Sequence, residues 1–122
     1  MKAGKEHRVP LCNRAMDILI SIQSNRHETE FVFSGWRIGS GLSNGAMLAL
    51  MKKIDFGPYT PHGFRSTFRD WAADEAHTFQ NETIELALAH TIKNKAEAAY
   101  RRGDQMERRR ELMAAWNAFV EI

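Results

Sequence analysis

The stretch that decides the fold is Thr60-Pro61-His62-Gly63-Phe64-Arg65-Ser66-Thr67-Phe68-Arg69-Asp70-Trp71. It predicts the start of a helix, because Thr60 suits the N-cap and Pro61 suits the first helical position, where a missing N–H costs nothing. Phe64, Phe68 and Trp71 recur at helical spacing and form an apolar face. We therefore expect this stretch to begin the central helix of the chain.

The same stretch also predicts a phosphate-binding site. His62 and Arg65 are three positions apart, so their side chains share one face of the first helical turn. Free backbone N–H groups and the positive end of the helix dipole lie at the same end. Taken singly, His62 could be an ordinary helix-start residue and Arg65 could pair with a surface carboxylate. Arg69 is expected to form a structural ion pair with Asp70 or Asp74.

Length and composition limit the class of protein. With 122 residues, 43% of them hydrophobic and 10% aromatic, the chain is one domain or part of one and can build a core. A formal net charge of +2 is too small to indicate nucleic-acid binding by itself. The single Cys12 excludes a disulfide framework and a cysteine-rich zinc site, and it fits a reducing intracellular compartment. No apolar run of membrane-spanning length and no signal peptide is found.

Hydrophobic periodicity and capping residues predict a mainly α chain with one or two short β-strands. The expected helices are 13–24 with Asn13 as a cap, one capped by Ser43 that reaches Ile54, 61–76, 82–89 capped by Asn81, 95–101 and 105–120. The expected strands are 8–11, with Pro10 at an edge, and 31–33. The sequence contains no internal repeat and no low-complexity tract.

Two later residues have the chemistry of a nucleic-acid site. His90 lies at the C-terminal end of the expected helix 82–89, and Tyr100 follows within Ala98-Ala99-Tyr100-Arg101-Arg102. Small residues before Tyr100 leave room for another surface, and the arginines after it supply positive charge. His90 could instead be a helix-end histidine favoured by the dipole, and Tyr100 a half-buried core residue.

These motifs carry a family resemblance. His62-Gly63-Phe64-Arg65, Leu88-Ala89-His90 and Ala99-Tyr100-Arg101, in this order, resemble the tyrosine recombinases, which are the integrases of phages and genomic islands. The sequences around His62 and His90 are similar to those of prophage-type integrases in particular. The ordered set extends through nearly the whole chain and is far more specific than a His-x-x-Arg pair alone.

The resemblance implies a position in a longer protein. Residues 1–122 would be the C-terminal portion of a mixed α+β integrase catalytic domain. The first part of that domain and the N-terminal DNA-binding domain would lie outside the chain. The family uses a further arginine from the earlier part, so we expect strand cleavage by this chain alone to be impaired. Losing one transition-state donor typically costs about 10²–10³ in rate.

The resemblance also implies a mechanism that needs no cofactor and no metal. Tyr100 would be the nucleophile that attacks a DNA phosphodiester, giving a 3′-phosphotyrosine and a free 5′-hydroxyl. Arg65 would hold two non-bridging phosphate oxygens with its planar fork, and His90 would be a second phosphate ligand. His62 would be a hydrogen-bonding or general-base partner near Tyr100, and Lys2 the acid for the leaving 5′-hydroxyl.

The implied partners are a duplex DNA attachment site, contacted by Arg101 and Arg102, and further copies of the protein in a recombination synapse. No membrane and no small-molecule substrate are expected, and by resemblance the protein acts in the bacterial cytoplasm. The remaining arginines of the cluster 101–110 are expected on a solvated helix face. The apolar stripe of the last helix could pack within the chain or on a neighbouring protomer.

Two other functions stay open at this stage. The chain could be a DNA-binding or oligomerisation module, derived from an integrase, that has no catalytic turnover. It could also be a small helical regulator whose motifs only resemble those of the family.

Overall fold

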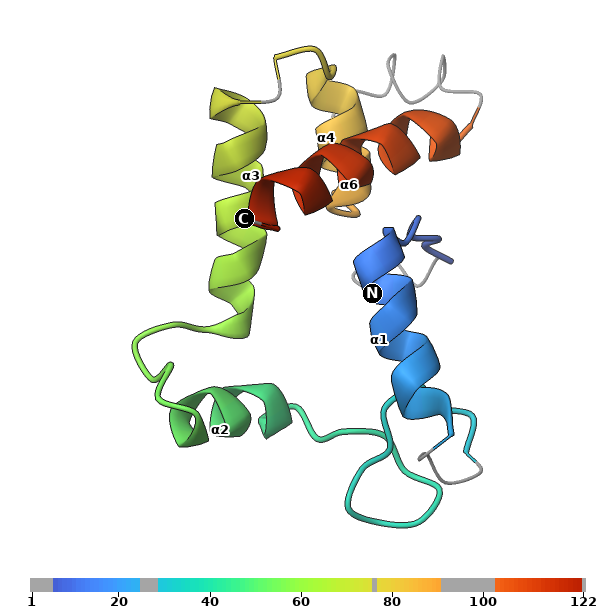
Figure 1. The fold of residues 1–122 in the computed structure, drawn as a ribbon, viewed down its shortest axis with the longest axis vertical. Helices are drawn as coiled ribbons and strands as arrows, with labels where there is room; N and C mark the ends of the chain where they lie inside the picture. The colour runs from blue at the N-terminus through green and yellow to red at the C-terminus, as the bar shows by residue number, and fades with distance from the viewer. Residues whose placement is uncertain (1–5, 25–28, 76, 91–102, 122) are drawn as a thin grey trace. The chain divides into compact units, whose positions relative to one another are not determined.

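The computed structural model describes residues 6–24, 29–75, 77–90 and 103–121 (Figure 1). In these ranges the chain forms five helices, which are α1 (Asn13–Gln23), α2 (Ala46–Lys53), α3 (Pro61–Asp74), α4 (Asn81–Ala87) and α6 (Met106–Val120). The prediction of a mainly helical chain is confirmed. The helix expected at 95–101 lies outside the described residues.

The short strands expected at 8–11 and 31–33 are not formed in the described part of the chain, where the β-pairing consists of one isolated antiparallel bridge between Ser34 and Gly41. The loop turns back on itself there, since the Gly35 N–H donates to the Ser40 carbonyl over 2.7 Å. A run of three apolar residues does not become a strand unless a partner strand supplies the ladder of hydrogen bonds.

The chain divides into two compact units, Ala15–Ser66 and the combination of Met1–Arg14 with Thr67–Ile122. The second of these, the core unit, holds the buried apolar cluster. Its buried members come from α3 (Phe68, Trp71 and Ala72), from α4 and its C-terminal end (Ile84 and Leu88), and from α6 (Leu112). Of the apolar face predicted for the central helix, Phe68 and Trp71 are buried in this cluster, whereas Phe64 is exposed.

Aromatic rings join α3 to α6 inside the core unit. The Trp116 ring centroid lies 5.4 Å from that of Phe68, edge-on, and 5.1 Å from that of Trp71. Phe119 extends the cluster, with its centroid 5.8 Å from that of Trp71. Such offset and edge-to-face pairs add about 0.5–1.5 kcal/mol each beyond their buried area. Leu112, Met113 and Trp116 of the apolar stripe thus pack within their own chain, whereas Phe119 and Val120 are about half exposed.

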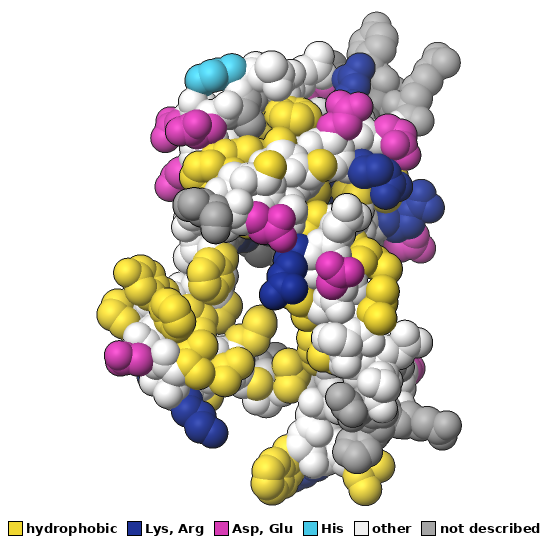
Figure 2. Space-filling view, viewed as in Figure 1, with side chains coloured by type: hydrophobic (Ala, Val, Ile, Leu, Met, Phe, Trp, Pro, Cys, Tyr) yellow, Lys and Arg dark blue, Asp and Glu magenta, His cyan; other side chains and the backbone are white. Residues whose placement is uncertain are grey.

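The unit Ala15–Ser66 buries much less of its apolar surface. Met51 of α2 is buried, whereas Trp36 and Ile38 in the loop before α2 are almost completely exposed. Figure 2 shows apolar side chains gathered on the surface. No described helix is both long and apolar enough to cross a membrane.

Helix α3 begins as the sequence predicts. Thr60 Oγ1 accepts a hydrogen bond from the Gly63 N–H over 3.0 Å, which makes Thr60 the N-cap and places Pro61 at the first helical position. The helix ends at Asp74, two residues before the expected end.

Removal of this cap gives the first testable prediction. We expect Thr60→Ala to lower the free energy of unfolding by about 1 kcal/mol, because the Gly63 N–H loses its side-chain acceptor and keeps only the Thr60 carbonyl, 3.0 Å away. Thr60→Ser keeps the oxygen and is the matched control. Urea unfolding followed by circular dichroism measures both variants, and equal stability of Thr60→Ala and Thr60→Ser would rule out a capping role.

Three other predicted caps differ from the structure. Asn13 is itself the first residue of α1 rather than the residue that precedes it. Helix α2 begins at Ala46 after Gly45, and Ser43 contributes only its backbone carbonyl, which accepts the Ala46 N–H over 3.2 Å. Asn81 is the first residue of α4, with Gln80 at the N-cap position. The Asn81 side chain is engaged elsewhere, because its Oδ1 accepts a hydrogen bond from Arg69.

Candidate functional site

The predicted site residues fall into three groups. His62 and Arg65 lie at the start of α3, in the unit Ala15–Ser66. His90 follows α4 in the core unit. Tyr100, together with Lys2, Arg101 and Arg102, lies outside the described residues. The structure therefore brings together His62 with Arg65, and the convergence of all four main residues on one phosphate stays a prediction.

His62 and Arg65 share the N-terminal part of α3. The His62 side chain is exposed and Arg65 is half-buried. The first turn of α3 contains no acidic residue, so no carboxylate of this turn opposes the positive end of the helix dipole. An imidazole, a guanidinium and the helix end can all bind an anion such as a phosphate.

The chain around His90 is fixed by a Schellman motif. Helix α4 ends at Ala87, and the next residues close it with two backbone hydrogen bonds, from Ala89 N–H to Leu86 O over 3.0 Å and from His90 N–H to Glu85 O over 2.9 Å. Ala89 takes the left-handed conformation that this motif requires, with φ of 56°. The helix consequently stops two residues before the predicted end, and His90 is the second residue beyond its C-cap.

The strained Ala89 gives a second prediction. We expect Ala89→Gly to raise the free energy of unfolding by up to about 1 kcal/mol, because a left-handed L-residue costs about 1–2 kcal/mol and glycine avoids most of that penalty. Ala73→Gly on the exposed side of α3 should have the opposite sign, by about 0.5–1 kcal/mol. Thermal unfolding of the two variants tests the contrast, and destabilisation by both would refute it.

The His90 ring belongs to a chain of polar contacts between α3 and α4. His90 Nδ1 contacts Glu85 Oε2, and Glu85 Oε1 receives Arg69 Nε over 2.9 Å. Arg69 Nη2 in turn donates to Asn81 Oδ1 over 2.9 Å. Partial burial raises the pKa of the Glu85 carboxyl, but the hydrogen bonds and charges of His90 and Arg69 outweigh it and hold that pKa below its ordinary value.

Glu85 is the residue that sequence reasoning missed. Arg69 does form a structural ion pair, as predicted, but its partner is Glu85 rather than Asp70 or Asp74. Asp70 is the next residue along the helix and so faces away from Arg69, whereas Glu85 approaches from a separate helix. The signal available in the sequence was the five-residue spacing between Glu85 and His90, which the closing turn of a helix can bring together.

The prediction that the arginines of the last helix lie on a solvated face is wrong for Arg109, which is buried. Its side chain is 2% exposed. Nη2 donates to the Arg8 carbonyl and Nη1 to the Asp104 carbonyl, the latter over 3.3 Å. Burial lowers the pKa of Arg109, although the charge of Asp104 opposes this. Helical spacing places Arg109 on the same face of α6 as the fully buried Leu112, three positions further on, and that face packs into the core unit.

These contacts anchor the segment that follows the predicted nucleophile. Asp104, four positions after Tyr100 in the sequence, also pairs with Arg8 over 3.7 Å. Arg109 thus joins the start of α6 to the segment that contains Arg8.

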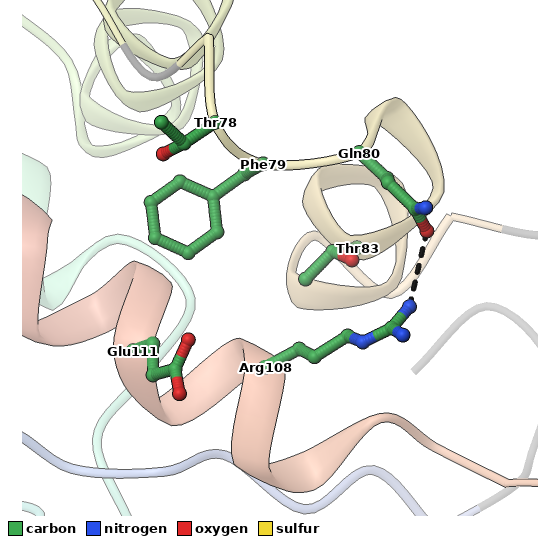
Figure 3. A pocket seen from close by; sticks show the side chains of 6 residues that line it. All are labelled: Thr78, Phe79, Gln80, Thr83, Arg108 and Glu111. Carbon is green, nitrogen blue, oxygen red and sulfur yellow. Dashed lines mark hydrogen bonds between the residues drawn. The ribbon is translucent and has the colours of Figure 1, made fainter.

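A hollow of about 330 Å³ lies in the core unit and is lined by Thr78, Phe79, Gln80, Thr83, Arg108 and Glu111 (Figure 3). Arg108 Nη1 donates to Gln80 Oε1 over 3.1 Å across its rim. Thr83 Oγ1 and Gln105 Oε1 are 2.6 Å apart. None of the predicted site residues lines this hollow.

Within the described ranges, no group of three or more His, Cys, Asp or Glu side chains could hold a metal ion.

Comparison with known proteins shows distant homology to phage and prophage integrases. The chain is 32% identical to the prophage integrase IntA of Escherichia coli K12, and the match covers 99% of the chain and 29% of that relative. It is 29% identical to the integrase of Shigella phage Sf6, over 99% of the chain and 32% of the relative. It is 27% identical to the integrase of Enterobacteria phage P4, and that match covers 100% of the chain and 29% of the relative.

The chain therefore spans about a third of the length of these relatives. It matches no protein-family profile, and no solved structure matches it.

Proposed function

We propose that this chain is the C-terminal portion of the catalytic domain of a site-specific tyrosine recombinase and that Tyr100 cleaves duplex DNA through a 3′-phosphotyrosine. The observation that carries the proposal is the match to integrases along 99% of the chain. The ordered residues His62, Arg65, His90 and Tyr100 add to it, because they are the groups that such a reaction needs.

The proposed chemistry is a transfer of a phosphodiester between two oxygens. The Tyr100 phenol loses its proton and its oxygen bonds to phosphorus, while the bond from phosphorus to the 5′-oxygen breaks. A phenol with an ordinary pKa of about 10 needs help at neutral pH, and His62 is the proposed base or hydrogen-bond partner. Lys2 would return a proton to the leaving 5′-oxygen. The bond energy is kept in the phosphotyrosine, so rejoining needs no cofactor.

The proposed role of Arg65 follows from its shape and its position. Two parallel N–H donors match two non-bridging oxygens of the scissile phosphate, and their hydrogen bonds strengthen as charge develops in the transition state. The start of α3 supports this role, since the positive end of its helix dipole lies at the same end as Arg65 and its first turn contains no acidic residue. His90 would bind the phosphate from the end of α4. Arg101 and Arg102 would contact neighbouring DNA phosphates.

A nicked suicide substrate tests the proposal. Cleavage next to the nick releases a short strand that diffuses away, so even a slow reaction accumulates a covalent protein–DNA adduct. We expect the wild-type chain to form this adduct and Tyr100→Phe to form none. Denaturing electrophoresis with labelled DNA measures the product. An adduct of equal amount in Tyr100→Phe would exclude Tyr100 as the nucleophile.

The second candidate is a DNA-binding or oligomerisation module without turnover. The observation that favours it is the exposed apolar surface of the unit Ala15–Ser66, which suits assembly with further protein. Salt-sensitive DNA binding by the wild-type chain with no adduct would select this function. Absence of both binding and adduct would contradict an integrase function altogether.

A further inference from the structure

The side chain of Glu85 contacts the predicted phosphate ligand His90 from the same helix end. Two links join the residues, since the His90 N–H donates to the Glu85 backbone carbonyl over 2.9 Å and Glu85 Oε2 contacts His90 Nδ1. The first link fixes the position of the His90 backbone. The second determines which edge of the imidazole ring faces Glu85. The His90 side chain is 44% exposed and that of Glu85 27%, so the contact lies at the surface and the ring stays accessible.

Glu85 itself is held in place from α3. Arg69 Nε lies 2.9 Å from Oε1, the carboxylate oxygen that His90 does not use. Asn81 Oδ1 accepts from Arg69 Nη2, so the guanidinium is fixed by two acceptors. Each carboxylate oxygen therefore has one separate partner, and the carboxylate cannot turn away from His90 without losing the ion pair with Arg69.

This geometry determines which ring nitrogen of His90 can bind a DNA phosphate. Within the described residues the ring's polar contact is the one between Nδ1 and Glu85, which leaves Nε2 for another partner. A carboxylate only accepts hydrogen bonds, so Nδ1 must carry a proton. In the doubly protonated ring Nε2–H donates as well, and the charge of Glu85 balances the positive ring when it binds an anion.

We propose that Glu85 is a positioning residue for His90, which holds the Nδ1 edge of the ring and presents Nε2 to a non-bridging oxygen of the DNA phosphodiester. This inference rests on the proposed function for the identity of the phosphate and on the contacts of Glu85 for the orientation of the ring. Arg69 acts one step further out, because it keeps the carboxylate aligned.

The first test reads the ring directly and does not depend on activity. In Glu85→Gln the Arg69 guanidinium has only donors, so it retains the amide oxygen, and the amide NH₂ then faces His90. Nδ1 must accept from this group, so the single proton of the neutral ring moves to Nε2. Long-range ¹H–¹⁵N spectra at the alkaline end of a pH titration distinguish the two tautomers. We expect Nδ1–H in the wild type and Nε2–H in Glu85→Gln.

The matched control is Glu75→Gln, an exposed carboxylate beyond the end of α3. It should leave the His90 spectrum as in the wild type. An identical His90 tautomer in Glu85→Gln and in the wild type would overturn the positioning role.

The second test measures the consequence for DNA cleavage on the nicked substrate. Partners that orient a ligand-binding histidine are typically worth about 10–100-fold, and we expect Glu85→Ala to slow adduct formation by a factor in this range. Glu75→Ala should stay within about threefold of the wild type. Unchanged cleavage in Glu85→Ala would overturn the inference, even if the His90 tautomer switches in Glu85→Gln. Absence of adduct from the wild type would overturn the proposed function itself, and the phosphate part of the inference with it.

Discussion

Leu112→Ala is expected to lower the free energy of unfolding of the chain by about 2–5 kcal/mol. Leu112 is completely buried on α6, in the cluster that also contains Phe68 and Trp71 of α3 and Ile84 of α4. Removing its isobutyl group loses the transfer free energy of the buried carbons and leaves a cavity. The surrounding aromatic rings are large and packed on one another, so they cannot easily move to fill it.

Leu50→Ala on α2 is the matched control, since the same atoms are removed from a side chain that is 54% exposed. We expect less than about 1 kcal/mol there. Urea unfolding monitored by tryptophan fluorescence suits the comparison, because Trp71 and Trp116 lie in the affected cluster. Similar losses in the two variants would mean that Leu112 is not the centre of the core.

Arg65→Lys is expected to slow adduct formation on the nicked substrate by about 10²–10³-fold, the usual effect of losing one oriented donor to a developing anion. Lysine keeps the positive charge but replaces a planar fork with a single flexible ammonium group, so two phosphate oxygens can no longer be held at once. The variant should retain wild-type stability to within about 1 kcal/mol, because Arg65 is only half-buried.

Arg69→Lys is the matched comparison on the same helix. We expect it to reduce stability more than the rate of adduct formation, the reverse of Arg65→Lys. The Arg69 guanidinium uses two nitrogens for Glu85 and Asn81, and a lysine can keep only one of these contacts well. We expect a loss of about 1–2 kcal/mol in stability, with less than tenfold loss in adduct formation. Equal rate losses in the two variants would refute the assignment of Arg65 to the phosphate.

The central helix shows how far local signals reach. Thr60 and Pro61 determine where α3 begins, because an N-cap oxygen and a proline at the first position act within a single turn. The mainly helical character follows in the same way from apolar residues that recur every three or four positions. The candidate phosphate-binding residues were also accessible from sequence, since His62 and Arg65 need only helical spacing to share a face.

Other features depended on neighbours that are distant in the chain. Ser43 and Asn81 have good capping side chains, yet neither caps its helix, and Asn81 binds Arg69 of α3 instead. The run 31–33 has the composition of a strand but lacks a partner strand to pair with. Local propensity is worth a few tenths of a kcal/mol to about one, and a single tertiary hydrogen bond or its absence can outweigh it.

What the sequence by itself determined is the helical class and the beginning of α3, because both depend on spacing and capping within a few residues. The assignment of His62, Arg65, His90 and Tyr100 to phosphodiester chemistry comes from the family resemblance and stays a prediction. Only the tertiary structure decided that Arg109 is buried and that Glu85 joins Arg69 to His90. Glu85 of α4 meets Arg69 of α3, and the Arg109 guanidinium meets the backbone carbonyls of Arg8 and Asp104. These partners lie apart in the chain or in non-helical segments, so the packing of the whole core unit fixes which groups meet.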